Sequence, residues 1–548
     1  MPSDLLSLLP LGILVLVTSL ACEWSARSHW LPYWLSRKVL HFIAVGACAW
    51  APFLVESLWS LVAIVCPAWV VLLWLVSSRK LMVDEEGRRA WGIVWFPLAY
   101  LVLLLSAGQD KSIVVFPMAV LAVCDPAATI AGTLFARKQY NLTGDEKSLV
   151  GNTVFFFSFL VLCALFFKTP LIPEPFSSVW AYLPLMGMVL AAVEALGSRG
   201  LDNLYIPLVA AAIWQRLTVA GPMAPVLHLY TVALLALLFL WLMYKRSSLT
   251  ADGSVGAWLL AVGIVWFGHW TLLLPILLFF SSSILIGKLF PSQLPSDYKS
   301  GKGRDVVQVY ANGGIYLMLI FLVFPSGPGV LVTSGSSGQM IQTPIFDYQV
   351  IKTSQLGEVW YRICTSAGGY IEGSGWNTLA VTDQPFSLAP YFSGMLIVPL
   401  AVMAVANSDT WSSEVGRYVK GRTYDIVRFR RVEPGLSGGI SLAGTLAGGL
   451  GAGLIGSLAF FISDEWITGF LVFAVIGFFG FMGMLLDSIL GALFQRKYKH
   501  PATGKQYDHP WWENQVNKNN KRKLWMSNDA VNFVSQLIMA AVVVELLS

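Results

Sequence analysis

The chain has 548 residues, of which 56% are hydrophobic and only 12% are charged, and its formal net charge is +5. This composition excludes an ordinary soluble domain and indicates a polytopic membrane protein. The modest positive charge does not indicate a nucleic-acid-binding protein. The six cysteines include no CxxC pair, so neither a zinc site nor a disulfide framework is expected.

Apolar runs recur along the chain, and we expect an all-α polytopic integral membrane protein with about 14–16 transmembrane helices in two helical-bundle modules. The runs fall near residues 5–22, 39–56, 58–77, 91–106, 112–136, 152–168, 180–196, 203–218, 222–244, 254–268, 270–288, 309–326, 390–407, 438–461, 467–493 and 528–547. Three of them, 91–106, 203–218 and 254–268, are short, and a re-entrant arrangement is the alternative for these. The first run lacks the basic region of a cleaved signal peptide, so we interpret it as a span.

The basic residues indicate an orientation. With the N-terminus outside, the inner loops hold 31 of the 36 Lys and Arg residues, as the positive-inside rule requires. We therefore expect a protein of the bacterial inner membrane whose candidate sites face the cytoplasm. The chain divides near Lys245 into modules 1–246 and 247–548. Residues 327–389 are too polar to span and are expected to form a non-membrane insertion without a catalytic role.

The first module carries charged residues inside or beside apolar runs. Asp125 lies within such a run, and a carboxylate at membrane depth costs a few kcal/mol or more, which indicates a functional site. Lys38 and His41 are three residues apart, so on a helix they share a face that suits an anionic phosphate. Glu194 and Asp202 could complete a metal site with Asp125. The alternatives are interfacial anchoring, a packed histidine and ordinary loop acids.

Three ordered segments of this module carry a family resemblance. RKVLHF, VCDPAATIAGTLF…EKSLVGN and VEALGSRGLDNLYIPL resemble the phytol kinase branch of the dolichol kinase and CTP-dependent diacylglycerol kinase family. The resemblance implies an all-helical membrane bundle that transfers a phosphate from CTP to a lipid alcohol. The matching positions are Lys38, His41, Asp125, Gly132, Lys147, Ser148, Gly151, Glu194, Asp202 and Asn203. Asn152-Thr153 departs from the Ser-x-Ala pattern expected there, and no Walker A motif is present.

The second module repeats part of this pattern. Asp409 is followed by Gly416 seven residues later, just as Asp125 is followed by Gly132. A Gly/Ser stretch at 434–441 offers backbone N–H groups and hydroxyls at an expected helix start, which is a ready anion site. Arg304, Gln308 and Asn312 are spaced by four and are expected to line one helix face; a hydrogen-bonding seam between helices is the alternative for them.

The motifs LTADGSVGAW, FFSSS, QVYANGG, NSDTWSSEVG, PGLSGGISLAGTLAG, LLDSILGALFQ and SNDAVNF resemble a second membrane family. That family includes the plant and cyanobacterial phytyl-phosphate kinase. The candidate site residues at matching positions are Asn312, Asp409, Ser413, Glu414, Ser437, Gly438, Asp487, Asn528 and Asp529.

Together the two resemblances lead to one hypothesis, a natural fusion that converts phytol or a related prenyl alcohol to the monophosphate and then to the diphosphate. Its partners would be Mg²⁺, the lipid substrates, the bilayer and CTP, with UTP or ATP as other possible donors. The expected catalytic residues are Asp125, Lys147, Lys38, His41, Asp409 and Glu414. The expected cofactor-binding residues are Ser148, Gly151, Asn203, Asn312, Ser437, Gly438 and Asn528. The expected metal ligands are Asp125, Glu194, Asp202, Asp409, Asp487 and Asp529.

Two rival functions are compatible with intramembrane acids. A lipid or isoprenoid transporter would also carry them, although its polar groups are expected near the bilayer midplane rather than at inner helix ends beside basic loops. A CTP:lipid-phosphate cytidylyltransferase would retain CMP in its product, so labelled α- or γ-phosphate of CTP would distinguish it from a kinase.

Overall fold

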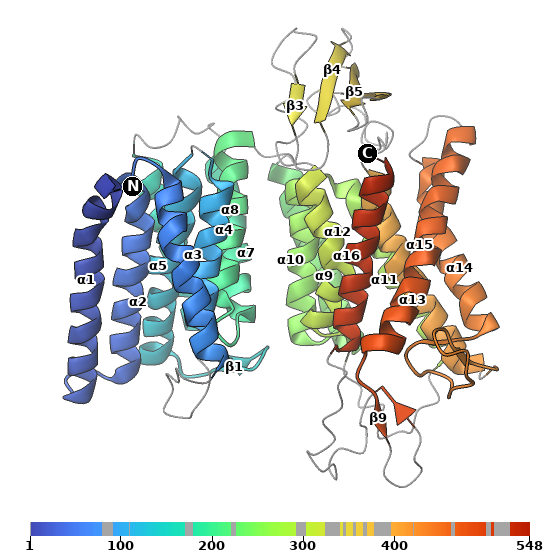
Figure 1. Ribbon diagram of the computed structural model, residues 1–548, viewed down its shortest axis with the longest axis horizontal. Coiled ribbons are helices and arrows are strands. Elements are labelled where there is room, and N and C mark those ends of the chain that lie inside the picture. The colour runs from blue at the N-terminus through green and yellow to red at the C-terminus, as the bar shows by residue number, and fades with distance from the viewer. Residues whose placement is uncertain are drawn as a thin grey trace. The chain divides into compact units, whose positions relative to one another are not determined.

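The structure is a computed structural model. It describes residues 2–78, 91–108, 110–169, 179–220, 226–291, 303–323, 340–342, 347–353, 358–364, 370–376, 396–419, 421–461, 466–499, 506–508 and 526–547. Contacts within the chain define two compact units, unit 1 (Met1–Gly221) and unit 2 (Pro222–Ser548). Figure 1 shows that each is a bundle of helices.

Unit 1 contains eight α-helices and one short hairpin within its described residues. The helices are α1 (Pro2–Arg27), α2 (Tyr33–Trp50), α3 (Leu58–Ser77), α4 (Gly92–Ser106), α5 (Ser112–Phe135), α6 (Leu149–Phe166), α7 (Val179–Leu196) and α8 (Asp202–Gln215). Strands β1 (Tyr140–Asn141) and β2 (Glu146–Lys147) pair antiparallel between α5 and α6. Stacking of Phe116 on Trp214, with ring centroids 3.9 Å apart, joins α5 to α8 in the core.

Unit 2 also contains eight α-helices within its described residues. They are α9 (Val226–Lys245), α10 (Ala251–Phe267), α11 (Leu273–Leu289), α12 (Val306–Val323), α13 (Ile397–Val419), α14 (Leu442–Gly456), α15 (Trp466–Phe494) and α16 (Asn528–Leu547). Two hairpins join helices: β7 (Tyr424–Asp425) with β8 (Gly439–Ile440), and β9 (Tyr498–Lys499) with β10 (Gln506–Tyr507). Helices α10 to α15 all contribute side chains to the core. Within it Tyr316 is fully buried, and its hydroxyl donates to Leu272 O (2.8 Å).

A small antiparallel sheet lies in the segment between α12 and α13 that was expected to be a polar insertion. Its strands are β3 (Met340–Gln342), β4 (Asp347–Thr353), β5 (Glu358–Cys364) and β6 (Tyr370–Trp376), in the order β3-β4-β5-β6. The register shifts between Val350 and Lys352, where β4 pairs with β5. The described residues of this segment therefore form strands rather than a membrane helix.

The expected all-α membrane fold is confirmed. Each of the sixteen apolar runs corresponds to one helix, and ten helices in the described part of the chain are long and apolar enough to cross a membrane. Helices α4, α10 and α12 are shorter apolar helices. The main difference is at α13, which continues twelve residues past the expected end at residue 407 and so includes Asp409 and Glu414.

The boundary between the units lies earlier than the expected break near Lys245. Helix α9 belongs to unit 2 because it packs against α10, where Trp258 Nε1 donates a hydrogen bond to Ala233 O (3.1 Å). A sequence cannot show this directly, because a basic pair marks the end of a span but not the bundle to which the span belongs.

The last five helices of each unit share most of their packing contacts. In unit 1, α5 contacts α4, α6 and α8, α7 contacts α6 and α8, and α4 contacts α8. In unit 2, α13 contacts α12, α14 and α16, α15 contacts α14 and α16, and α12 contacts α16. One contact differs, because α13 also packs extensively on α15, whereas α5 and α7 share no comparable contact in the described residues. The preceding helices differ, because α2 packs on α5 whereas α11 packs on α13. The repeated acid–glycine spacing is therefore part of a repeated helical framework.

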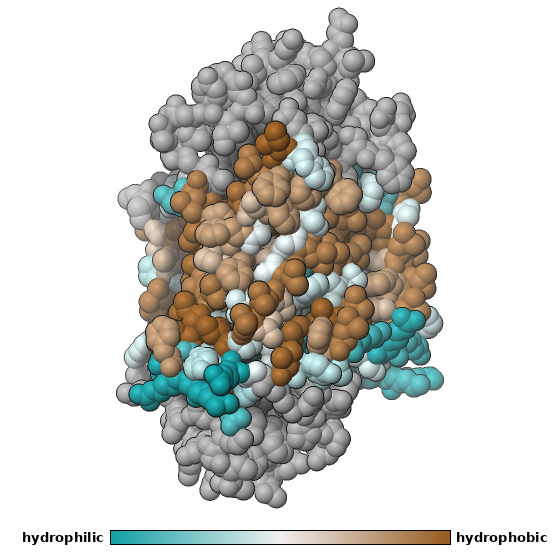
Figure 2. All heavy atoms as spheres, turned by 90° about the vertical axis from the view of Figure 1, so that its right-hand side faces the viewer, coloured by the Kyte–Doolittle hydropathy of each residue, from teal (hydrophilic) through white to brown (hydrophobic). Residues whose placement is uncertain are grey.

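Helix α14 shows how such a helix is placed between protein and lipid. Leu442, Leu446 and Leu450 form an exposed stripe, each at least 62% exposed. On another side of the helix, a Cβ added at Gly448 would lie 3.2 Å from Ser408 Oγ, so glycine allows close contact with α13. Figure 2 shows this side of unit 2 as a broad hydrophobic band with hydrophilic residues gathered at one edge, as expected of a lipid-facing surface.

Candidate functional site

The site in unit 1 is organised around Asp125, whose side chain is buried within α5. Lys38 Nζ lies 2.8 Å and His41 Nε2 lies 3.5 Å from the same oxygen, Asp125 Oδ2. Both partners come from α2, so the expectation that they share one helix face is confirmed. Asp125 is ten residues from the last residue of α5, or about 15 Å along the axis. It therefore lies well inside the helix rather than at its end.

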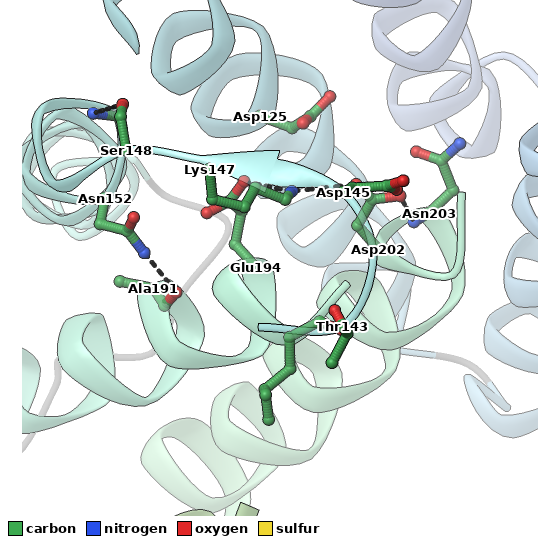
Figure 3. Close-up of polar contacts among 12 residues, drawn as sticks. Asp125, Thr143, Asp145, Lys147, Ser148, Asn152, Ala191, Glu194, Asp202 and Asn203 are labelled. Atoms are coloured by element: carbon green, nitrogen blue, oxygen red, sulfur yellow. Dashed lines mark hydrogen bonds and ion pairs between the residues drawn. The ribbon is translucent and has the colours of Figure 1, made fainter. Parts of the chain in front are cut away.

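A second group lies beside the hairpin that connects α5 to α6. Lys147 Nζ is 2.6 Å from Glu194 Oε1 and 3.5 Å from Asp202 Oδ2. Figure 3 shows Lys147 between these acids, with Asp125 on the neighbouring helix. Glu194 comes from the last turn of α7 and Asp202 begins α8, so three elements meet at this lysine.

The hairpin positions Lys147 through contacts on its partner strand. Tyr140 is the register partner of Lys147, and its hydroxyl donates to Asn152 Oδ1 (2.6 Å). Asn152 Nδ2 in turn donates to Ala191 O (3.0 Å) in α7. Asn152, the position that departs from the family pattern, therefore ties the hairpin to the helix that carries Glu194. Sequence reasoning did not identify Tyr140. The strand pairing that places it opposite Lys147 is visible in the structure but not in the sequence.

Ser148 and the nearby glycines shape the start of α6. Ser148 Oγ accepts a hydrogen bond from Gly151 N (3.0 Å) and caps the helix. A Cβ at Gly132 would lie 2.7 Å from Ser148 Oγ, and one at Gly151 would lie 3.0 Å from Ala128 O. The glycines thus allow α5 and α6 to approach closely, and Ser148 is already engaged as a helix cap.

Burial and charge oppose each other at Lys147. Burial alone would lower its pKa, but the carboxylates of Glu194 and Asp202 outweigh burial and raise the pKa above the ordinary lysine value. Lys147 therefore remains cationic at neutral pH. The site as a whole brings together two lysines, three carboxylates and His41 from α2, α5, the hairpin, α7 and α8.

Asn203, one of the expected nucleotide-binding residues, joins two helices. Its Nδ2 donates to Gly92 O (3.2 Å) at the start of α4. A Cβ at Gly200, which has a positive φ of 77°, would clash with the Gly92 backbone. Asn203 and Gly200 therefore hold α8 against α4 and so position Asp202.

The carboxylates of this site are the groups that could bind a metal ion. Within the described ranges, no group of three or more His, Cys, Asp or Glu side chains is arranged to hold a metal ion. Lys147 separates Glu194 from Asp202, and Lys38 occupies Asp125 Oδ2. Mg²⁺ commonly takes only one or two protein carboxylates, with the remaining ligands from substrate phosphates and water. The donor chemistry therefore fits a phosphate-bound Mg²⁺ but not a preformed three-carboxylate cage.

In unit 2 the corresponding helix is α13, and Asp409 is ten residues from its last residue. Asn407 precedes it and is fully buried; Asn407 Nδ2 donates to Gly451 O (2.8 Å), and Asn407 Oδ1 accepts from Ser282 Oγ (2.9 Å). Glu414 lies one turn beyond Asp409, and its Oε1 accepts from Arg417 Nη2 (3.0 Å). Asp409 thus lies in a polar segment of α13 that is hydrogen-bonded to α11 through Ser282 and to α14 through Gly451.

The helix cap that follows each hairpin gives a further correspondence between the two halves. Ser441 caps α14 by accepting from Gly444 N (3.2 Å), just as Ser148 caps α6. A Cβ at Gly416 would lie 3.3 Å from Ser441 Oγ, matching the contact of Gly132 with Ser148. Ser441, which ends the Gly/Ser stretch at 434–441 but was not among the expected site residues, is therefore the counterpart of Ser148. The residue before it is Ile440, where unit 1 has Lys147.

Ser437 and Gly438 lie earlier, in the turn that leads into β8 rather than at the start of α14. Ser437 N donates to Asp508 Oδ2 (2.8 Å) and Ser437 Oγ donates to Gln495 Oε1 (2.5 Å). Gly438 has a positive φ of 81° and packs against Ala492 in α15. These two residues join the hairpin to α15, and within the 434–441 stretch Ser441 is the residue at the start of α14.

The remaining candidates of unit 2 gather where α12, α15 and α16 meet. Asp487 Oδ2 accepts from Ser535 Oγ (2.9 Å), and Asn312 Oδ1 accepts from Asn532 Nδ2 (3.5 Å). Asn528 Oδ1 accepts from Gln495 Nε2 (3.5 Å), and Asp529 lies in the first turn of α16. Arg304 precedes α12 rather than continuing the Gln308–Asn312 face.

Comparisons with known proteins find one family model and two relatives. A model of the family described as integral membrane protein DUF92 matches residues 234–540. Protein PGR of Arabidopsis thaliana is 26% identical over 283 residues, which cover 50% of this chain and 81% of that protein. An uncharacterised membrane protein of Methanocaldococcus jannaschii is 40% identical over 106 residues, or 19% of this chain and 43% of that relative. No solved structure matches.

Proposed function

The chain belongs to the DUF92 family of integral membrane proteins, and we propose that it is a membrane-bound phosphotransferase with one site in each unit. Unit 1 would phosphorylate an isoprenoid alcohol, such as phytol, to the monophosphate, and unit 2 would add the second phosphate. CTP would be the donor, with UTP or ATP as alternatives. Both sites would face the cytoplasm, where nucleotides are available.

The convergence of Lys38, Asp125 and Lys147 in one site carries this proposal. Asp125 lies about 15 Å inside its helix, within reach of a hydroxyl that enters from the bilayer. Lys147 lies on a hairpin outside the helices and interacts electrostatically with Asp125. The arrangement therefore suits a lipid alcohol approaching from the membrane and a nucleotide approaching from water.

The reaction in unit 1 is a single displacement. The alcohol oxygen bonds to the γ-phosphorus of CTP while the bond to the β–γ bridging oxygen breaks, the alcohol proton passes to a protein base, and CDP leaves. Asp125 is one candidate base. His41 is the other, because its Nε2 is buried, has no hydrogen-bond partner in the described part of the chain and lies 3.5 Å from Asp125 Oδ2. Lys38 and Lys147 would exchange their carboxylate partners for phosphate oxygens.

Mg²⁺ bound with the nucleotide would neutralise phosphate charge. Asp125 with Glu194 or Asp202 would hold it in unit 1, and Asp409 with Asp487 or Asp529 would hold it in unit 2. In unit 2 the acceptor already carries a phosphate, so this site must bind two anionic groups. Glu414 and Arg417 lie near the C-terminal end of α13, and the β7–β8 hairpin with its basic residues follows that helix.

Product analysis by mass spectrometry tests the proposal. Membranes that contain the protein would receive phytol, Mg²⁺ and CTP, with ATP and UTP as comparisons. We expect phytyl diphosphate and CDP. Monophosphate alone would remove the proposed role of unit 2. A lipid that retains CMP would identify a cytidylyltransferase, and unchanged lipid with several alcohols would favour transport.

A further inference from the structure

The loop before α10 clamps the backbone of Arg304. Arg304 O accepts hydrogen bonds from Thr250 N (3.1 Å) and Thr250 Oγ1 (3.2 Å). Asp252 Oδ2 accepts from Val306 N (3.0 Å) and thereby caps the first turn of α12. A Cβ at Gly253 would collide with Arg304 O, so glycine is needed for this approach. The LTADG motif, which the proposed reaction does not use, therefore fixes the backbone position of Arg304.

The guanidinium of Arg304 lies among aromatic rings, and Glu414 of α13 acts on its charge from beyond ion-pair distance. Its Cζ is 5.7 Å from the ring centroids of both Phe279 and Phe280, and its Nη1 donates to Ser283 Oγ (3.1 Å). No carboxylate in the described part of the chain lies within ion-pair distance of it. Aromatic stacking orients a guanidinium but does not neutralise its charge. The remaining N–H groups are therefore available to an anionic ligand.

Arg304 is connected to the segment of α13 that carries Asp409. Ser282, next to Ser283, donates to Asn407 Oδ1 (2.9 Å) and accepts from Trp411 Nε1 (3.3 Å). Asn407 and Trp411 lie two residues before and after Asp409. Arg304 is thus held beside the candidate reaction site of unit 2, by the helix that supports that site.

We propose that Arg304 binds the phosphate of a lipid phosphomonoester in unit 2. The assignment of that lipid as the acceptor rests on the proposed function. Unit 2 has Ile440 at the position of Lys147, so it lacks one of the cations of unit 1. Arg304 supplies a cation from a different element, and its planar fork suits two oxygens of a phosphate group. This would make unit 2 selective for the monophosphate over the uncharged alcohol.

Direct binding tests this assignment without requiring phosphate transfer. The full chain would be placed in phosphatidylcholine nanodiscs, and binding of radiolabelled phytyl phosphate would be measured in the absence of nucleotide. We expect Arg304→Gln to weaken binding at least tenfold and Arg304→Lys to give an intermediate loss. Arg246→Gln is the matched control, because Arg246 is exposed in the same unit, and it should bind as the unmodified protein does.

Two further measurements distinguish specific recognition from a folding defect and from general anion binding. Ser283→Ala removes the hydroxyl contact but keeps the guanidinium, and should weaken binding less than Arg304→Gln. Inorganic phosphate should not compete at concentrations that match the lipid. Full competition by inorganic phosphate, unchanged binding by Arg304→Gln, or an equal loss of phytol binding would each overturn the assignment.

The test of Arg304 can fail or succeed independently of the proposed phosphate transfer. If the protein binds phytyl phosphate through Arg304 but transfers no phosphate from any nucleotide, the site stands and the kinase reaction does not. If the protein makes the diphosphate and Arg304→Gln leaves the KM for phytyl phosphate unchanged, the reaction stands and the assignment of Arg304 is wrong. Monophosphate formation from phytol in unit 1 should be unaffected by Arg304→Gln.

Discussion

Lys147 Nζ lies 2.6 Å from Glu194 Oε1, although the two residues are 47 positions apart in the chain. The pair joins the β1–β2 hairpin to α7, and both side chains are largely buried. Loss of one partner of a buried ion pair leaves an uncompensated charge and costs about 3–5 kcal/mol, whereas loss of both costs much less. Substituting both residues together can therefore distinguish a structural role of Lys147 from its proposed role in phosphate transfer.

We expect Lys147→Met to lower the melting temperature of the purified protein and to abolish monophosphate formation. Glu194→Gln should also destabilise the protein, and the double variant Lys147→Met/Glu194→Gln should regain most of the stability but none of the activity. Melting curves in detergent and product analysis measure the two effects. Recovery of activity in the double variant would show that Lys147 acts only structurally.

Asp125→Asn should abolish monophosphate formation while leaving diphosphate formation from added monophosphate intact. Asp409→Asn should have the reverse effect, because each carboxylate lies at the equivalent place in its own unit. Mass spectrometry of products from phytol and from phytyl phosphate measures both reactions. The two-site hypothesis fails if either variant loses both activities or neither.

His41→Phe should reduce monophosphate formation by about 10²–10⁴-fold if His41 accepts the alcohol proton. The change keeps a ring in a site of similar size, so the melting temperature should change little. His228→Phe is the control, because His228 is exposed on α9. A loss of less than tenfold would assign the base to Asp125 instead.

Gly200→Ala should destabilise unit 1 strongly. Gly200 has a φ of 77°, which alanine rarely adopts, and the added Cβ would collide with the backbone of Gly92. Gly46→Ala in α2 is the matched control, since nothing lies within 4 Å of its added Cβ, and it should stabilise the helix by up to about 1 kcal/mol. Melting temperatures of the two variants should therefore move in opposite directions.

Stability of unit 2 should depend on pH through Asp508. Burial raises the pKa of Asp508 to about 6, although the hydrogen bond from Ser437 N and the charges of Lys497 and Arg417 act in the opposite direction. The folded state then binds the proton more tightly than the unfolded state, whose carboxyl titrates near pH 3.9. The stabilising contribution is complete below about pH 4 and is lost as the pH rises through 6.

Asp508→Asn should therefore reduce the difference between melting temperatures measured at pH 5 and pH 7.5. The matched control is Asp145→Asn in unit 1, which changes a half-buried carboxylate that accepts a hydrogen bond from Arg199 N (2.8 Å). An unchanged pH dependence in Asp508→Asn would contradict the proposed origin of the effect.

The order and approximate position of every helix followed from the sequence alone. A membrane span is a local property, because about 20 consecutive apolar residues suffice to cross the bilayer. The shared face of Lys38 and His41 also followed, since residues three apart on one helix are always neighbours. The end of α13 was missed because apolarity stops near residue 407 while the helix continues through polar residues.

Contacts between helices were decided only by the tertiary structure. The sequence indicated that Lys147, Glu194 and Asp202 belong to one site, but the position of Lys147 between the two acids depends on how α7 and α8 pack. Ser441 rather than Ser437 became the counterpart of Ser148, because the length of the hairpin determines which serine caps the helix. Spacing along a chain determines faces within one helix, whereas distances between helices arise from side-chain packing that no single segment encodes.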